Sequence, residues 1–174
     1  MKAQLQQKFD ELEAKKAAFL QIISTATQEQ RLYKPTEQAW CMLQVGHHVL
    51  LAEAGATKFM LNRQALKVGS WQKIKSKIYS LMLTIFLKSP LKFKAPKVAA
   101  AAVEEQLLPL EQLETQWAEA RQQLLQYLAN FDEAKLSYSV FKHPFVGPLT
   151  IAQTLDFMTE HISHHIAQLE RLKQ

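Results

Sequence analysis

The chain of 174 residues is long enough to bury a core as one domain spanning 1–174, and its 48% hydrophobic residues, 21% charged residues and net charge of +5 are close to ordinary globular usage. A single cysteine, Cys41, excludes a disulfide framework and fits a reducing compartment. The longest apolar stretch, Ile78 to Leu87, is too short to span a bilayer, and Met1 to Lys16 lacks the apolar core of a signal peptide, so we expect a cytoplasmic protein without a membrane span.

Helical spacing of apolar residues predicts four long helices. They run from about Ala3 to Ala26, from about Gln38 to Asn62, from about Glu104 to Asn130 and from about Thr150 to Leu172. Leu107 is among the apolar positions of the third helix. In the fourth, Thr150 followed by Gln153 fits a capping box, and Gly147-Pro148 breaks whatever precedes it. No strand-like alternation is longer than the stretch from Leu136 to Phe141.

A long connection separates the second helix from the third. It contains a shorter helix, predicted from Trp71 to Lys88, and an extended stretch around Pro90 to Pro96. Such a length is too great for a simple antiparallel turn. We therefore expect an all-α protein, a four-helix bundle with a long crossover between its second and third helices.

The crossover segment, 63–103, is basic. Ten of the 21 basic residues, and none of the 16 acidic ones, lie between Ala54 and Val103. Such a basic segment could bind nucleic acid, anionic lipid or an acidic substrate. More frequently, a segment of this kind is a connector that its lysines keep solvated. Because nine of these ten basic residues are lysines and only one is an arginine, we expect no sequence-specific nucleic-acid partner.

Six histidines are the main chemical clue: His47, His48, His143, His161, His164 and His165. His161 and His165 lie one turn apart on the fourth helix and border its apolar stripe, a spacing that allows two imidazoles to reach one metal ion. His48 lies within a stripe of small apolar residues on the second helix. Three imidazoles can thus point into one bundle core. The same spacing also fits core histidines, and both interpretations stay open at this point.

Two segments carry a resemblance to a known family. The stretch Trp40-Cys41-Met42-Leu43-Gln44-Val45-Gly46-His47-His48-Val49-Leu50-Leu51-Ala52-Glu53 resembles the second-helix motif of the DinB-like superfamily, and the connector Phe93-Lys94-Ala95-Pro96 looks like one found in a branch of that family. Its C-terminal motif is similar to His143-Pro144-Phe145-Val146-Gly147-Pro148-Leu149-Thr150 followed by Gln153, Phe157, His161, His165 and Gln168.

The resemblance implies a four-helix bundle that binds a divalent metal through His48, His161 and His165. Nickel or zinc is the first expectation, with iron or manganese as alternatives. Three protein ligands leave open positions, as in catalytic sites. Gln44, Gln168 and His143 are weaker candidates for supporting the ligands, and each could instead be an ordinary interface residue. Cys41 stands where the family often has a capping Ser or Thr, and it lies too far from His48 along the helix to be a ligand.

Three functions remain open. Family members with assigned chemistry are mostly thiol-dependent transferases or isomerases, so the first is transfer of a low-molecular-weight thiol to a small electrophilic substrate. The second is metal-dependent hydrolysis, which needs a general base; Glu53 and Glu160 point away from their neighbouring histidines. The third is a non-enzymatic, metal-binding or stress-response bundle, which could form a homodimer through Trp71, Tyr79 and Phe86.

Overall fold

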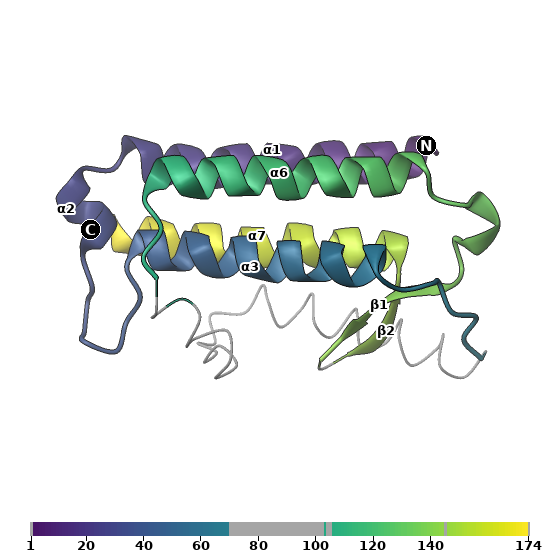
Figure 1. Ribbon diagram of the computed structural model, residues 1–174. Coiled ribbons are helices and arrows are strands. Elements are labelled where there is room, and N and C mark those ends of the chain that lie inside the picture. The colour runs from purple at the N-terminus through teal and green to yellow at the C-terminus, as the bar shows by residue number, and fades with distance from the viewer. Residues whose placement is uncertain (1, 70–102, 104–105, 145, 174) are drawn as a thin grey trace.

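The computed structural model describes residues 2–69, 103, 106–144 and 146–173. Four long helices dominate this part of the chain (Figure 1): α1 (Ala3–Thr25), α3 (Met42–Leu61), α6 (Leu110–Ala129) and α7 (Ile151–Leu172). A short helix α2 (Gln28–Leu32), a 3-10 turn η1 (Glu133–Lys135) and a hairpin of β1 (Ser139–His143) and β2 (Gly147–Thr150) connect them. The all-α four-helix bundle is therefore confirmed. The predicted helix Trp71 to Lys88, the stretch Pro90 to Pro96 and most of segment 63–103 lie outside the described residues.

The four helices lie side by side with their axes nearly aligned (Figure 1). Helix α1 packs against α7 and α6, and α3 packs against α6 and α7. Helices α3 and α6 run in the same direction (Figure 1), although they follow one another as long helices. Parallel neighbours cannot be joined by a short turn, so the predicted crossover between the second and third long helices is confirmed.

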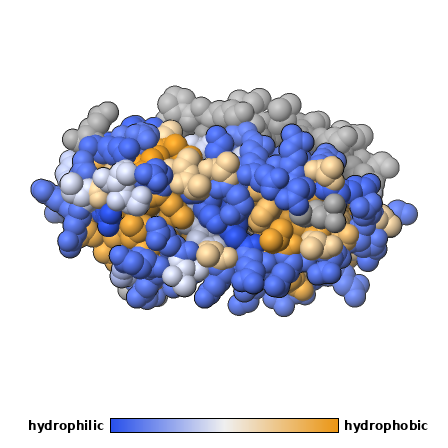
Figure 2. Space-filling model, turned by 90° about the horizontal axis from the view of Figure 1, so that it is seen from above, coloured by the Kyte–Doolittle hydropathy of each residue, from blue (hydrophilic) through white to orange (hydrophobic). Residues whose placement is uncertain are grey.

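The core lies between the helices and is lined by the apolar stripes that the sequence predicts. Leu12, Phe19 and Ile23 of α1 and Trp117 of α6 are fully buried. Figure 2 views the bundle from the side on which α1 and α6 lie, and its surface is mainly hydrophilic with separate apolar patches. None of the helices among the described residues is long and apolar enough to cross a membrane.

Two helix starts were predicted too early. Helix α3 begins at Met42 rather than Gln38, with Cys41 as its N-cap in an extended conformation. Helix α6 begins at Leu110 rather than Glu104, with Pro109 as its N-cap. Residues 106–109 are not helical, and Pro109 disfavours helical geometry in the residue before it, so α6 does not extend back through Leu108. Leu107, expected in the apolar stripe, is consequently 46% exposed.

The loop before the last helix contains the β1–β2 hairpin, which the sequence did not predict. The strands pair antiparallel, with Phe141 opposite Leu149 and His143 opposite Gly147. Gly147 has a φ of +80°, a conformation that suits glycine and allows the tight return of the chain. The hairpin leads directly into α7, whose predicted capping box is confirmed: Thr150 N–H donates to Gln153 Oε1 at 3.0 Å, and Gln153 N–H donates to Thr150 Oγ1 at 3.4 Å.

Gly46 allows α3 to approach α6 closely. A Cβ atom at Gly46 would lie 2.6 Å from Leu113 Cδ2, whereas one at Gly55 would meet nothing within 4 Å. Both glycines are inside the helix, so Gly46→Ala and Gly55→Ala gain the same helix propensity. We expect Gly46→Ala to be less stable than Gly55→Ala by about 1–3 kcal/mol, because Leu113 is fully buried and has little room to move. Urea denaturation of both variants measures the difference, and equal stabilities would contradict it.

Candidate metal centre

Three histidines from two helices meet in the bundle core. His48 comes from α3, and His161 and His165 come from α7. One nitrogen atom from each ring lies within 4.8 Å of the other two, and the three residues are only 8–9% exposed. The structure thus brings together the three residues that the sequence singles out, in an arrangement that could hold a metal ion.

The ring geometry follows from the helices that carry them. His161 and His165 are one turn apart, and their Nε2 atoms approach to 3.1 Å. The His48 ring lies opposite both, with its centroid 5.3 Å from that of His161 and 5.1 Å from that of His165. Because each helix fixes its own backbone, the spacing between α3 and α7 decides whether the three rings reach one ion.

Burial keeps the three imidazoles neutral. It lowers the pKa of His48 to about 4 and that of His165 to about 3, and it holds the pKa of His161 well below its ordinary value. Repulsion from neighbouring imidazoles adds to burial in each case. A metal ion binds the neutral form of histidine, so the free site is in the ligating form at neutral pH.

The hydrogen bonds of these rings also fit a metal ion. Gln168 Oε1 lies 2.8 Å from Nδ1 of His165, and because an amide oxygen can only accept, that nitrogen carries the proton. The lone pair of His165 Nε2 therefore points towards His161, as a ligand's would. Nδ1 of His48 and Nδ1 of His161 are buried without a hydrogen-bond partner among the described residues. Three neutral imidazoles form a donor set that suits zinc, nickel or iron.

The comparison with known families decides the chain's membership. Residues 11–169 match the profile of the DinB superfamily, which is nearly the whole chain. The chain belongs to the DinB superfamily. The match includes both segments that carry the resemblance and all three clustered histidines. No curated protein sequence matches the chain.

The remaining predicted residues of this DinB superfamily protein lie around the three histidines in different ways. Gln168 contacts His165 as described. Gln44 is buried, and its Oε1 accepts the N–H of Cys41 at 3.2 Å, so this oxygen belongs to the start of α3. His143 lies at the end of β1, and its Nδ1 accepts the N–H of Val146 at 3.3 Å. Of these residues, Gln168 is thus the one with a described hydrogen bond to the trio.

Aromatic rings that received no role in the sequence analysis surround the trio. The Trp40 ring lies 5.1 Å from that of His48, and the Phe157 ring stacks on His161 at 5.5 Å. Phe157 also contacts His143 at 4.6 Å. Trp40 and Phe157 belong to the quoted motifs, so their position there was the one available signal, but a motif does not say which ring a side chain touches.

We expect the metal-free protein to lose stability as the pH falls from about 6.5 towards 4. The unfolded chain protonates histidine near its ordinary pKa of about 6.5, whereas burial keeps His48 and its neighbours unprotonated when folded. The unfolded state then binds more protons, so acidification favours it, by about 1.4 kcal/mol per pH unit for each such group. Urea denaturation in chelator at pH 7, 6 and 5 measures this slope. His48→Phe should be less steep, and equal slopes for the two proteins would contradict the prediction.

Proposed function

We propose that this protein is a divalent-metal-dependent enzyme that transfers a low-molecular-weight thiol to a small electrophilic substrate. The observation that carries the proposal is the cluster of three neutral, buried imidazoles of His48, His161 and His165. Three protein ligands leave coordination positions for other molecules, as catalytic sites require. Nickel or zinc is the proposed ion, with iron or manganese as alternatives, since imidazole suits all but manganese well.

The chain's own residues orient the metal ligands and limit the access of water to the site. A bound divalent ion supplies Lewis acidity that favours the thiolate form of a coordinated thiol. Gln168 fixes the tautomer and orientation of His165, and the rings of Trp40 and Phe157 shield two sides of the site from water. In the transfer, the sulfur–hydrogen bond gives way to a sulfur–carbon bond, the thiol proton passes to water, and the leaving group departs with its bonding electron pair.

The hydrolytic alternative requires a general base, which the thiol reaction does not need. Hydrolysis by a metal-bound water calls for a general base near the ion. The carboxylate of Glu53, the acidic residue that follows His48 on α3, instead lies 2.7 Å from the guanidinium of Arg121 on α6.

A homodimer and a cytoplasmic location stay predictions. The residues predicted for a dimer interface, Trp71, Tyr79 and Phe86, lie outside the described residues.

Elemental analysis of untagged, purified protein is the first test. We expect about one divalent ion per chain, and thiol-dependent consumption of a reactive electrophile such as monobromobimane when glutathione, cysteine or coenzyme A is supplied. His164→Ala is a matched control, because His164 adjoins His165 without belonging to the trio. An absence of metal, together with no gain in melting temperature on adding nickel or zinc, would leave the three histidines as core residues of an interaction bundle.

A further inference from the structure

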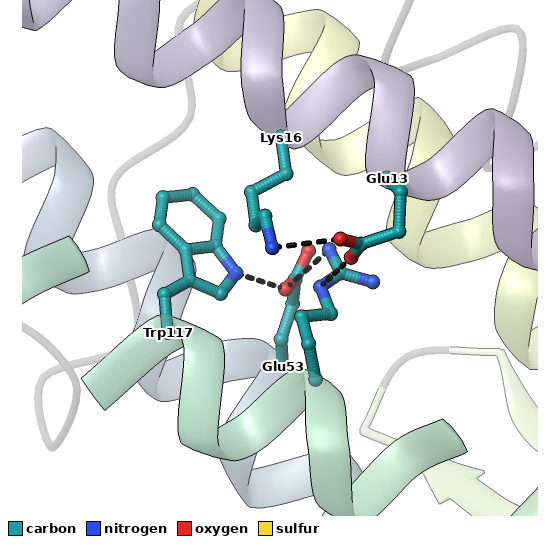
Figure 3. A network of polar contacts seen from close by, with 5 residues as sticks. Glu13, Lys16, Glu53 and Trp117 are labelled. Atoms are coloured by element: carbon teal, nitrogen blue, oxygen red, sulfur yellow. Dashed lines mark hydrogen bonds and ion pairs between the residues drawn. The ribbon is translucent and has the colours of Figure 1, made fainter. Parts of the chain in front are cut away.

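A buried network of charges joins three helices of the bundle (Figure 3). Trp117 Nε1–H of α6 donates to Glu53 Oε2 of α3 at 2.6 Å, and Nη2 of Arg121 lies 2.7 Å from the same oxygen. On its other side, Nε of Arg121 lies 3.3 Å from Oε1 of Glu13 on α1, and Lys16 contacts the other carboxylate oxygen of Glu13, Oε2, at 2.8 Å. Glu53 and Arg121 are 3% and 4% exposed, so their charges are held almost wholly within the core.

This network lies on the side of α3 opposite the candidate metal centre. Glu53 follows His48 by five residues, which places it about 140° around the helix and about 7.5 Å further along the axis. Gly46, which allows the close approach of Leu113, lies about 160° from His48. One face of α3 therefore packs against α6, and the opposite face presents His48 to α7. Any slide or rotation of α3 against α6 moves His48 relative to His161 and His165.

Buried charges restrict such movement more strongly than apolar contacts do. Apolar side chains resist such a slide through their close packing, but they can repack against new apolar neighbours. A buried carboxylate that leaves its guanidinium partner becomes an unpaired charge in the core, which is strongly unfavourable. Polar groups buried in helix bundles are known to fix helix register in this way. The pair of Glu53 and Arg121 is thus suited to select one height and one rotation of α3.

Within the described residues, the network contains buried polar atoms without hydrogen-bond partners, which lower its contribution to the stability of the fold. Glu53 Oε1 and Arg121 Nη1 are buried and have no hydrogen-bond partner among the described residues. Buried ion pairs with unsatisfied atoms are generally no more stable than well-packed apolar residues of similar volume. Retaining this pair is more readily understood if it provides positional accuracy.

We propose that Glu53, Trp117 and Arg121 form a positioning device for the metal centre, setting the height and rotation of His48 opposite His161 and His165. This inference rests on the proposed function, because it presumes that the three histidines bind a metal ion. Metal–ligand distances are defined to within about 0.2 Å, so a small displacement of α3 is enough to weaken a site whose ligands come from two helices.

The test is a paired substitution, Glu53→Gln with Arg121→Met, which removes one charge of each sign. The amide oxygen of the introduced glutamine can still accept the indole N–H, methionine replaces the arginine stem, and Glu13 keeps Lys16. Lys2→Met with Glu133→Gln is the matched control, since it removes an exposed ion pair elsewhere in the bundle. Zinc affinity, the visible absorption spectrum of the cobalt(II)-loaded protein and the melting temperature of metal-free protein are measured for each.

The expected result separates positioning from folding. The melting temperature of the metal-free paired variant stays close to that of the wild type, zinc affinity falls by at least about tenfold, and the cobalt bands shift. The control variant retains the affinity and the spectrum of the wild type. An unchanged affinity and an unchanged cobalt spectrum in the paired variant would overturn the inference.

Two further measurements cover the other outcomes. If the paired variant does not fold, Trp117→Phe replaces it, because this change removes the indole donor to Glu53 and keeps an aromatic ring in the core; weaker zinc binding supports the inference and unchanged binding overturns it. If wild-type protein binds neither zinc nor cobalt, the proposed function fails. Crystal structures of the metal-free proteins then test the inference separately. A displaced α3 in the variant supports a positioning role of the network, and an unmoved α3 overturns it.

Discussion

Replacing His161 with alanine is expected to abolish stable metal binding. His161 lies close to both other members of the trio, with its Nε2 3.1 Å from Nε2 of His165 and its ring 5.3 Å from that of His48. Four-ligand structural zinc sites bind with about 10–16 kcal/mol, which corresponds to about 3 kcal/mol per ligand. Losing one of three ligands should therefore weaken binding at least about a hundredfold. Purified protein would then retain little metal after dialysis against a weak chelator.

The comparison variants distinguish ligand loss from a damaged core. His161→Phe fills the space of the imidazole with an apolar ring and should lose metal as completely as alanine, but with a smaller loss of stability. His164→Ala keeps the trio intact and should retain about one ion per chain. Equimolar zinc in His161→Phe, or an equal loss of zinc in His164→Ala, would contradict the assignment of ligands.

The helical periodicity of the sequence was sufficient to predict the part of this site that lies on a single helix. His161 and His165 are one turn apart in any regular helix, and the capping box of Thr150 and Gln153 marked where that helix begins. The angle between His48 and Glu53 on α3 was likewise predictable, and the structure places Glu53 against Arg121. These are relations within a helix, which periodicity determines.

Relations between helices were not predictable in this way. The burial of Arg121 depends on partners from α1 and α3, and helical periodicity assigns no partner across a bundle. The close approach at Gly46 depends on where Leu113 of another helix falls. In contrast, the start of α6 could have been found, because Pro109 directly precedes it and was not used as a boundary signal. The hairpin was missed because four- and five-residue strands give too short an alternation to distinguish from a loop.

Replacing Arg121 alone with methionine is expected to be among the most destabilising single changes outside the metal centre. It leaves the Glu53 carboxylate buried, with the indole N–H of Trp117 as its remaining partner among the described residues. Breaking a buried ion pair from one side costs about 3–5 kcal/mol, which corresponds to a fall in melting temperature of about 10 °C for a chain of this size. Thermal and urea denaturation of metal-free protein at pH 8 measure this loss.

The pH dependence of that loss identifies its cause. Burial raises the pKa of Glu53 to about 7, and Arg121 and the indole N–H of Trp117 oppose the rise, so the pKa should rise further without Arg121. A carboxyl group with a raised pKa binds its proton more tightly in the folded state, so folding is disfavoured as the pH rises from its unfolded value of about 4.5 through the folded one. The deficit of Arg121→Met should therefore be smaller at pH 6 than at pH 8. Adding Glu53→Gln should recover most of it at pH 8, because the buried charge that lacks a partner is then gone. A deficit that does not change with pH or with Glu53→Gln would instead place the loss in the packing of the arginine stem.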